Sequence, residues 1–110
     1  MTQQLIAMLL DESRIGVDEV AGNCAVDQSW VVEYVHAGVL LENADPATDP
    51  ARWAFSSRDL IRARRLRDVA RQFDANPELA GLVVDLVEEL DRLRVRLRRE
   101  GVLPESSDLR

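Results

Sequence analysis

The chain has 110 residues, of which 46% are hydrophobic and 31% are charged. This is the size of one folded domain, and such a hydrophobic content excludes wholesale disorder. No apolar run approaches the roughly 18 residues of a membrane-spanning helix, so we expect no membrane attachment. A single cysteine, Cys24, excludes an internal disulfide framework and favours a reducing, cytoplasmic location.

The two halves of the chain differ in charge, within an overall net charge of -6. Residues 1–51 carry one Arg against nine acids, whereas residues 52–110 carry thirteen Arg against eleven acids. Because phosphate neutralisation supplies most nucleic-acid affinity, the acidic half favours a basic protein partner instead. The simpler interpretation is that these acids only keep the protein soluble.

The first elements are short. Residues 3–10 are apolar and predict either a strand or the start of a buried helix, not a cleaved signal peptide. Residues 17–24 predict a short helix with an acidic first turn. Asp27 is then expected to cap a second helix over residues 28–36, which ends at Gly38 in a left-handed conformation.

A ribbon and a third helix are expected next. Residues 39–41 and 53–55 predict two short strands, joined by a long loop that contains two prolines. A serine at 56 or 57 caps the following helix, which extends from about Arg58 to Phe73.

The last helix has the clearest pattern. Asn76 as N-cap and Pro77 at the first helical position start a helix that we expect to end near Glu100. Its apolar stripe has the spacing of a coiled coil and consists of Leu79, Val83, Leu86, Leu90, Leu93 and Leu97. Because a small domain cannot cover a helix about 36 Å long, we predict a homodimer through this stripe. The alternative is a hairpin with the preceding helix.

The sequence offers no catalytic, metal or cofactor site. Cys24 and His36 are the only cysteine and histidine, which is too few for a zinc site. The five glycines are scattered, so no phosphate-binding loop is present. Carboxylate pairs such as Asp18 and Glu19 are more typical of a helix start than of acid–base chemistry. We therefore expect a protein that is not an enzyme and holds no cofactor.

The order of these elements is that of a winged helix-turn-helix, and the residues resemble the MerR family of dimeric regulators. Residues 33–40 look like that family's second helix and its exit, residues 52–55 like its wing strand and residues 64–67 like part of its third helix. The resemblance implies a mainly α, MerR-like winged helix-turn-helix with a small β-ribbon and a long C-terminal coiled-coil helix. The corresponding parts are a domain over 1–75, a dimerisation helix over 76–101 and a flexible tail over 102–110.

Within that group, the chain more closely resembles the chaperone modulators called CbpM. The Trp53–Phe55 wing, the Arg65–Arg67 stretch and the leucine- and arginine-rich last helix stand where such features would. The resemblance implies a non-catalytic protein that binds the J-domain of a DnaJ-like co-chaperone of the CbpA type. It would thereby inhibit that co-chaperone's stimulation of DnaK. The stretch between Leu10 and Val17 looks longer than the corresponding part of that family.

The charges of the second helix distinguish a protein partner from DNA. A DNA-reading helix needs cationic or amide side chains, but residues 28–36 contain no Arg or Lys and carry Glu33, with Asp27 at their start. We therefore expect DNA to be disfavoured, and we predict J-domain contacts at Asp27, Trp30, Glu33 and Tyr34. An alternative for Trp30 and Tyr34 is a place in the core, which their helical spacing also fits.

The arginines of the third helix are the argument for the alternative function, a MerR-type DNA-binding transcription regulator. Arg58, Arg62 and Arg65 share one face of that helix, and Arg64, Arg67 and Arg71 share another. We expect these side chains to pair with acids of the same chain, and phosphate binding is the second interpretation. The expected partners are Asp68, four residues after Arg64 on the same helix, and Glu78, Asp85, Glu88 and Glu89 on the next helix.

Overall fold

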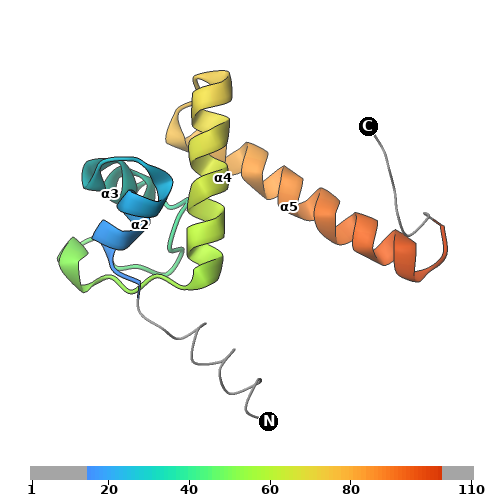
Figure 1. The fold of residues 1–110 in the computed structure, drawn as a ribbon, viewed down its shortest axis with the longest axis horizontal. Coiled ribbons are helices and arrows are strands. Elements are labelled where there is room, and N and C mark those ends of the chain that lie inside the picture. The colour runs from blue at the N-terminus through green and yellow to red at the C-terminus, as the bar shows by residue number, and fades with distance from the viewer. Residues whose placement is uncertain (1–14, 103–110) are drawn as a thin grey trace, which may run out of the picture.

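The computed structural model describes residues 15–102, which are mainly helical (Figure 1). In chain order the elements are α2 (Val17–Cys24), α3 (Gln28–His36), the 3₁₀ turn η1 (Pro50–Arg52), α4 (Ser57–Phe73) and α5 (Pro77–Arg99). The predicted bounds of these α-helices are confirmed to within one residue. The predicted element over residues 3–10 and most of the predicted tail lie outside the described residues.

Helices α2, α3 and α4 surround one apolar core, with α2 packed against both of the others. Each helix contributes fully buried side chains, among them Val20 of α2, Val31 of α3 and Leu66 of α4. Leu40 and Phe55 close this core from the segment between α3 and α4. Burial of such a side chain stabilises the fold by about 1.5–3 kcal/mol. These apolar contacts hold α3 in place on α2 and α4 and thereby determine which of its residues are exposed.

The predicted β-ribbon is not formed within residues 15–102. Residues 39–41 are bends, and Leu41 has a φ of 53° in the left-handed region. Phe55 pairs instead with Ile15, through two backbone hydrogen bonds of 3.0 and 2.9 Å. The large-small-large alternation over residues 53–55 therefore reflects the burial of Trp53 and Phe55. Both side chains are buried here with a single backbone bridge to Ile15 and without a ribbon.

Most helix ends follow their local sequence signals. Ser56 and Asp59 form a capping box at the start of α4, and the Asn76 side chain accepts a backbone N–H of the first turn of α5. Gly38 has a φ of 78°, as predicted for the residue that ends α3. Asp27 does precede α3, but its side chain accepts no capping hydrogen bond. The Asp27 carboxylate is therefore not used in capping.

Helix α5 leaves the three-helix body as a long rod (Figure 1). Near its start it packs on the domain through small residues, because Ala80, Gly81 and Val84 are the buried positions of α5. The leucines lie on the other side, where Leu79, Leu82, Leu86, Leu90 and Leu93 are 45–58% exposed. Val83 and Leu97 of the predicted stripe are half-buried. No helix within residues 15–102 is both long and apolar enough to cross a membrane.

Candidate interaction surface on helix α3

The predicted contact residues of α3 divide between the surface and the core. Asp27 and Glu33 are exposed, whereas Trp30 is half-buried. The Trp30 indole stacks on the Tyr34 ring, with centroids 3.9 Å apart and an interplanar angle of 17°. Tyr34 is only 2% exposed and therefore lies in the core, which was the alternative prediction for this residue. The aromatic contribution of α3 to its surface therefore comes from Trp30.

The Glu78 carboxylate of α5 adds a third negative charge to this region. Burial raises the pKa of the Tyr34 hydroxyl above its ordinary value of 10.0, and the negative charges of Glu33 and Glu78 raise it further. Glu78 is exposed in the first turn of α5. We call Asp27, Glu33, Glu78 and the half-buried Trp30 the α3 acidic face. The sequence did not indicate Glu78, because only the tertiary arrangement brings the start of α5 near α3.

An open groove of about 440 Å³ lies beside Trp30, between the α2–α3 turn and the end of α4. It is lined by Ala25, Val26, Asp27, Trp30, Arg67, Ala70, Arg71 and Asp74. Apolar side chains and the Trp30 ring supply one part of this lining. The carboxylates of Asp27 and Asp74 and the guanidinium groups of Arg67 and Arg71 supply the other part. The groove can therefore hold an apolar side chain of a partner among charges of both signs.

One set of α4 arginines holds the end of α2. Arg67 donates from Nη1 to the Cys24 carbonyl at 2.8 Å, and Arg71 donates from Nη2 to the Ala25 carbonyl at 3.1 Å. Arg64 donates to the Asn23 side-chain oxygen at 3.2 Å. Cations favour the negative end of a helix dipole, where backbone carbonyls lack partners within the helix. These arginines therefore have an intramolecular role.

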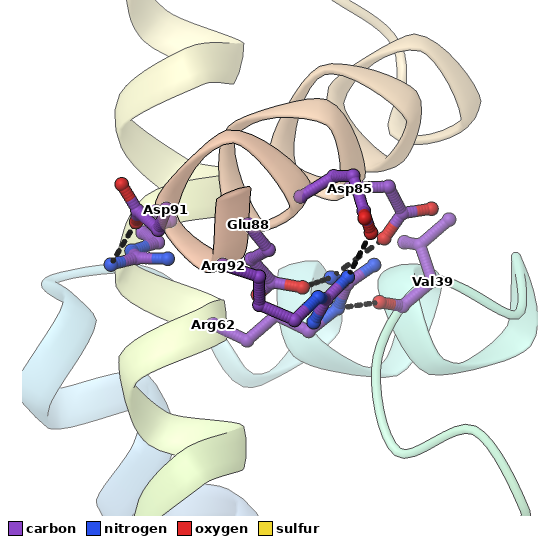
Figure 2. A network of polar contacts seen from close by, with 8 residues as sticks. Val39, Arg62, Asp85, Glu88, Asp91 and Arg92 are labelled. Atoms are coloured by element: carbon purple, nitrogen blue, oxygen red, sulfur yellow. Dashed lines mark hydrogen bonds and ion pairs between the residues drawn. The ribbon is translucent and has the colours of Figure 1, made fainter. Parts of the chain in front are cut away.

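A second set of arginines holds α5 on α4, as Figure 2 shows for Arg62. Arg62 donates from Nε to the Val39 carbonyl at 2.7 Å, and its Nη1 lies 2.9 Å from Asp85 and 3.1 Å from Glu88. Arg65 pairs with Asp91 at 3.5 Å. The predicted pairing of α4 arginines with acids of the last helix is thereby confirmed for Asp85 and Glu88.

Other pairs differ from those expected. Glu89 does not reach α4 and instead pairs with Arg92 within α5 at 2.7 Å. Asp68 was expected to pair with Arg64, but it pairs at 2.8 Å with its neighbour Arg67, while Arg64 bonds Asn23. Glu89 and Arg92 are three positions apart, a spacing at which side chains on a helix surface meet.

His36 and Cys24, the single histidine and cysteine of the chain, each have their own surroundings. His36 lies edge-on to Trp53, with ring centroids 5.8 Å apart. Cys24 is buried, and desolvation raises the pKa of its thiol above 9.0 although Arg67 and Arg64 act in the opposite direction. Among residues 15–102 no group of three His, Cys, Asp or Glu side chains is placed to hold a metal ion.

No protein-family model, no curated protein and no solved structure matches this chain. The surface of α3 and the positions of the arginines are therefore the features that bear on function.

Proposed function

We propose that this protein is a non-catalytic chaperone modulator that binds the J-domain of a DnaJ-like co-chaperone. It would thereby inhibit the co-chaperone's stimulation of DnaK, as the resemblance to CbpM implies. The observation that carries the proposal is the charge of the α3 acidic face. Asp27 and Glu33 are exposed there, and α3 contributes no Arg or Lys.

The arrangement of α2 and α3 supports a fold of the helix-turn-helix kind. The two helices are separated by only residues 25–27, which is the length of such a turn. In a DNA-binding protein of this kind, the second helix enters the major groove and reads base edges. Carboxylates at positions 27 and 33 would repel the phosphates on either side of that groove. We therefore propose that the surface used elsewhere for DNA serves here for a protein.

The arginines supply a second argument against DNA. Arg62, Arg67 and Arg71 use their guanidinium groups on carbonyls of the same chain, and Arg62 also binds two carboxylates. To contact phosphates, these side chains would have to leave their partners. The cost is largest for Arg62 and Arg67, whose side chains are only 20% and 19% exposed.

The expected partner is a basic helix, which is the surface that a J-domain presents to DnaK. Carboxylates on the α3 acidic face would guide its approach and fix its orientation. Apolar contact with Trp30 and the adjacent groove would supply much of the affinity, since interface energy concentrates at buried aromatic anchors. A cytoplasmic location belongs to the same proposal.

The proposal is tested by titrating the full chain against an isolated J-domain, with random duplex DNA as the competing ligand. We expect micromolar or tighter binding to the J-domain, and at least a tenfold loss with Glu33→Arg. Glu42→Arg is the matched control, because it makes the same charge change at an exposed position outside α3. Equal losses with both variants, or binding to duplex without binding to the J-domain, would contradict the proposal. The latter result would favour the MerR-type regulator.

We also propose that the protein is a homodimer through the exposed face of α5. Five leucines, about half-exposed, lie on a helix face that no described part of the chain covers. About half of each leucine is already covered, so burial of the rest would contribute roughly 1 kcal/mol per leucine. The sum over the ten leucines of two copies, about 10 kcal/mol, is comparable to the cost of association. The sedimentation velocity of the full chain over a range of concentrations tests this proposal independently of J-domain binding.

A further inference from the structure

The last turns of α5 carry an ordered set of side chains away from the leucine stripe. Arg92, Val95, Arg96 and Arg99 follow the spacing i, i+3, i+4 and i+7, which places them on one face of the helix. Val95 is 43% exposed and therefore lies outside the core. We call these four residues the α5 arginine face. Because it is turned away from the leucines, a dimer through the leucines would leave it accessible.

The rest of the chain does not neutralise the cations of this face. Residues 92–99 contain five Arg and no acid. Arg96 and Arg99 are exposed, and within residues 15–102 their guanidinium groups form no hydrogen bond or ion pair. Arg92 pairs only with Glu89, and both side chains of that pair are exposed. A basic helix face with an apolar residue at its centre suits an acidic surface that has an apolar groove.

The α3 acidic face is such a surface, and its charges are also free. The carboxylates of Asp27, Glu33 and Glu78 are exposed and form no ion pair in the described part of the chain. At 1.5 Å per residue, Asp27 and Glu33 are about 9 Å apart along α3, and Arg92 and Arg99 are about 10 Å apart along α5. The two faces therefore match in length as well as in charge.

The groove beside Trp30 supplies the apolar part of the match. Its volume of about 440 Å³ has room for an apolar side chain such as that of Val95. The two arginines of its lining, Arg67 and Arg71, already donate to backbone carbonyls of the α2–α3 turn. Their charge is therefore partly compensated, and the free carboxylates beside the groove are left to attract a cationic helix.

The two faces cannot meet within one copy of the chain. The buried positions of α5 end at Val84, and Arg99 lies roughly 22 Å further along the axis. Figure 1 shows that this end of α5 projects away from α3. The helix is continuous to Arg99, so it would have to break to fold back. Contact between the two faces therefore requires a second molecule.

We infer that the α5 arginine face of one copy binds the α3 acidic face of a second copy and thereby competes with the J-domain. The inference rests on the proposed function, because both ligands are basic helices for the same surface. The contact joins two different surfaces, so each association leaves one surface of each kind free at the ends. At high concentration and low salt the chain therefore associates further and covers its own J-domain site.

Sedimentation velocity of the full chain at low and high salt tests this contact. We expect species larger than a dimer at low salt that disappear as salt is raised, because exposed charge pairs are screened. Arg99→Glu is expected to abolish these species. Arg94→Glu is the matched control, because it makes the same charge change at an exposed residue outside the α5 arginine face and should retain them. Equal loss with both variants would contradict the inference.

A mixture of two variants tests whether the contact joins unlike faces. Glu33→Arg keeps the α5 arginine face, and Arg99→Glu keeps the α3 acidic face, so neither should form the larger species alone. An equimolar mixture should restore association, because each variant supplies the face that the other lacks. A mixture that does not associate would overturn the inference.

Addition of an isolated J-domain separates this inference from the proposed function. We expect the J-domain to disperse the larger species. A chain that binds the J-domain but forms nothing larger than a dimer at low salt overturns the inference and leaves the proposed function intact. Association that depends on Arg99 without any J-domain binding contradicts the proposed function and the competition, whereas it supports the contact between copies. Duplex DNA bound through Arg99 without self-association would overturn the inference and assign the α5 arginine face to nucleic acid.

Discussion

Gly81 of α5 and Val39 after α3 lie so close together that no side chain fits at position 81. A methyl group on Gly81 would come within 2.9 Å of the Val39 Cβ, which is closer than such atoms approach. The Val39 carbonyl also accepts the hydrogen bond from Arg62. Residue 39 therefore contacts α5 through its side chain and α4 through its carbonyl. These contacts fix the direction in which the leucine face points.

Gly81→Ala is expected to destabilise the fold by up to about 2 kcal/mol. Alanine in place of glycine favours a helix by about 1 kcal/mol, but overpacking at a rigid contact costs about 1–3 kcal/mol. Val39→Ala should recover part of the loss, because it removes the methyl groups that crowd position 81. Urea denaturation of the two single variants and the double variant measures these differences.

Gly22 of α2 provides the control for this prediction. A methyl group at Gly22 would meet nothing within 4 Å, so Gly22→Ala is expected to stabilise the protein by about 0.5–1 kcal/mol. The two alanine variants should therefore change stability in opposite directions. If both variants were more stable than the parent chain, Gly81 would not contact Val39 in solution.

Arg62→Met is expected to cost about 2–3 kcal/mol of stability. The substitution keeps an apolar stem but removes the bond to the Val39 carbonyl and leaves Asp85 and Glu88 without their cation. Arg92→Met is the matched control, because the pair of Arg92 with Glu89 is exposed and should leave the unfolding midpoint unchanged. Similar midpoints for the two variants would contradict a structural role for Arg62.

The sequence predicted the helices of the described part because their signals are local. The caps at Ser56 and Asn76, the left-handed Gly38 and the apolar spacing of α5 each act within a few residues. The face of α5 that packs on the domain could not be predicted in this way. Ala80 and Gly81 carry little hydrophobic signal, and their importance comes from a close approach to residue 39.

The sequence was less informative where distant segments meet. The pairing of Phe55 with Ile15, in place of the expected ribbon, depends on a contact across 40 positions. Glu78 joins the α3 acidic face only because α5 starts near α3. For Trp30 and Tyr34, helical spacing predicted an apolar face but could not decide which ring reaches the surface.

Ala25→Gly is expected to stabilise the protein by about 0.5–1 kcal/mol. Ala25 ends α2 in the left-handed region with a φ of 55°, where a Cβ is strained and glycine is not. The carbonyl that accepts from Arg71 is retained in the variant. Ala37→Gly is the control, because Ala37 ends α3 with a right-handed φ of -75° and gains nothing from glycine. Thermal unfolding of both variants checks the difference in sign.

Stability is expected to fall at alkaline pH through Cys24. Desolvation raises the thiol pKa in the folded protein above 9.0, so the folded state keeps a proton that the unfolded state releases. The unfolded state then binds fewer protons, and the free energy of unfolding decreases as pH rises above about 9. Cys24→Ala should flatten this dependence in denaturation curves between about pH 8 and 10.5. An unchanged slope would show that Cys24 is not desolvated.

Arg67 distinguishes a structural arginine from one that binds phosphate. Arg67→Met removes the hydrogen bond to the Cys24 carbonyl at the end of α2, and we expect a loss of about 1–2 kcal/mol in stability. Arg64→Met is the control, because Arg64 is exposed and bonds only an asparagine side chain, so its loss should be smaller. In a DNA-binding protein the outcome would be reversed. Duplex affinity would fall, its dependence on salt would become shallower, and the unfolding midpoint would stay the same.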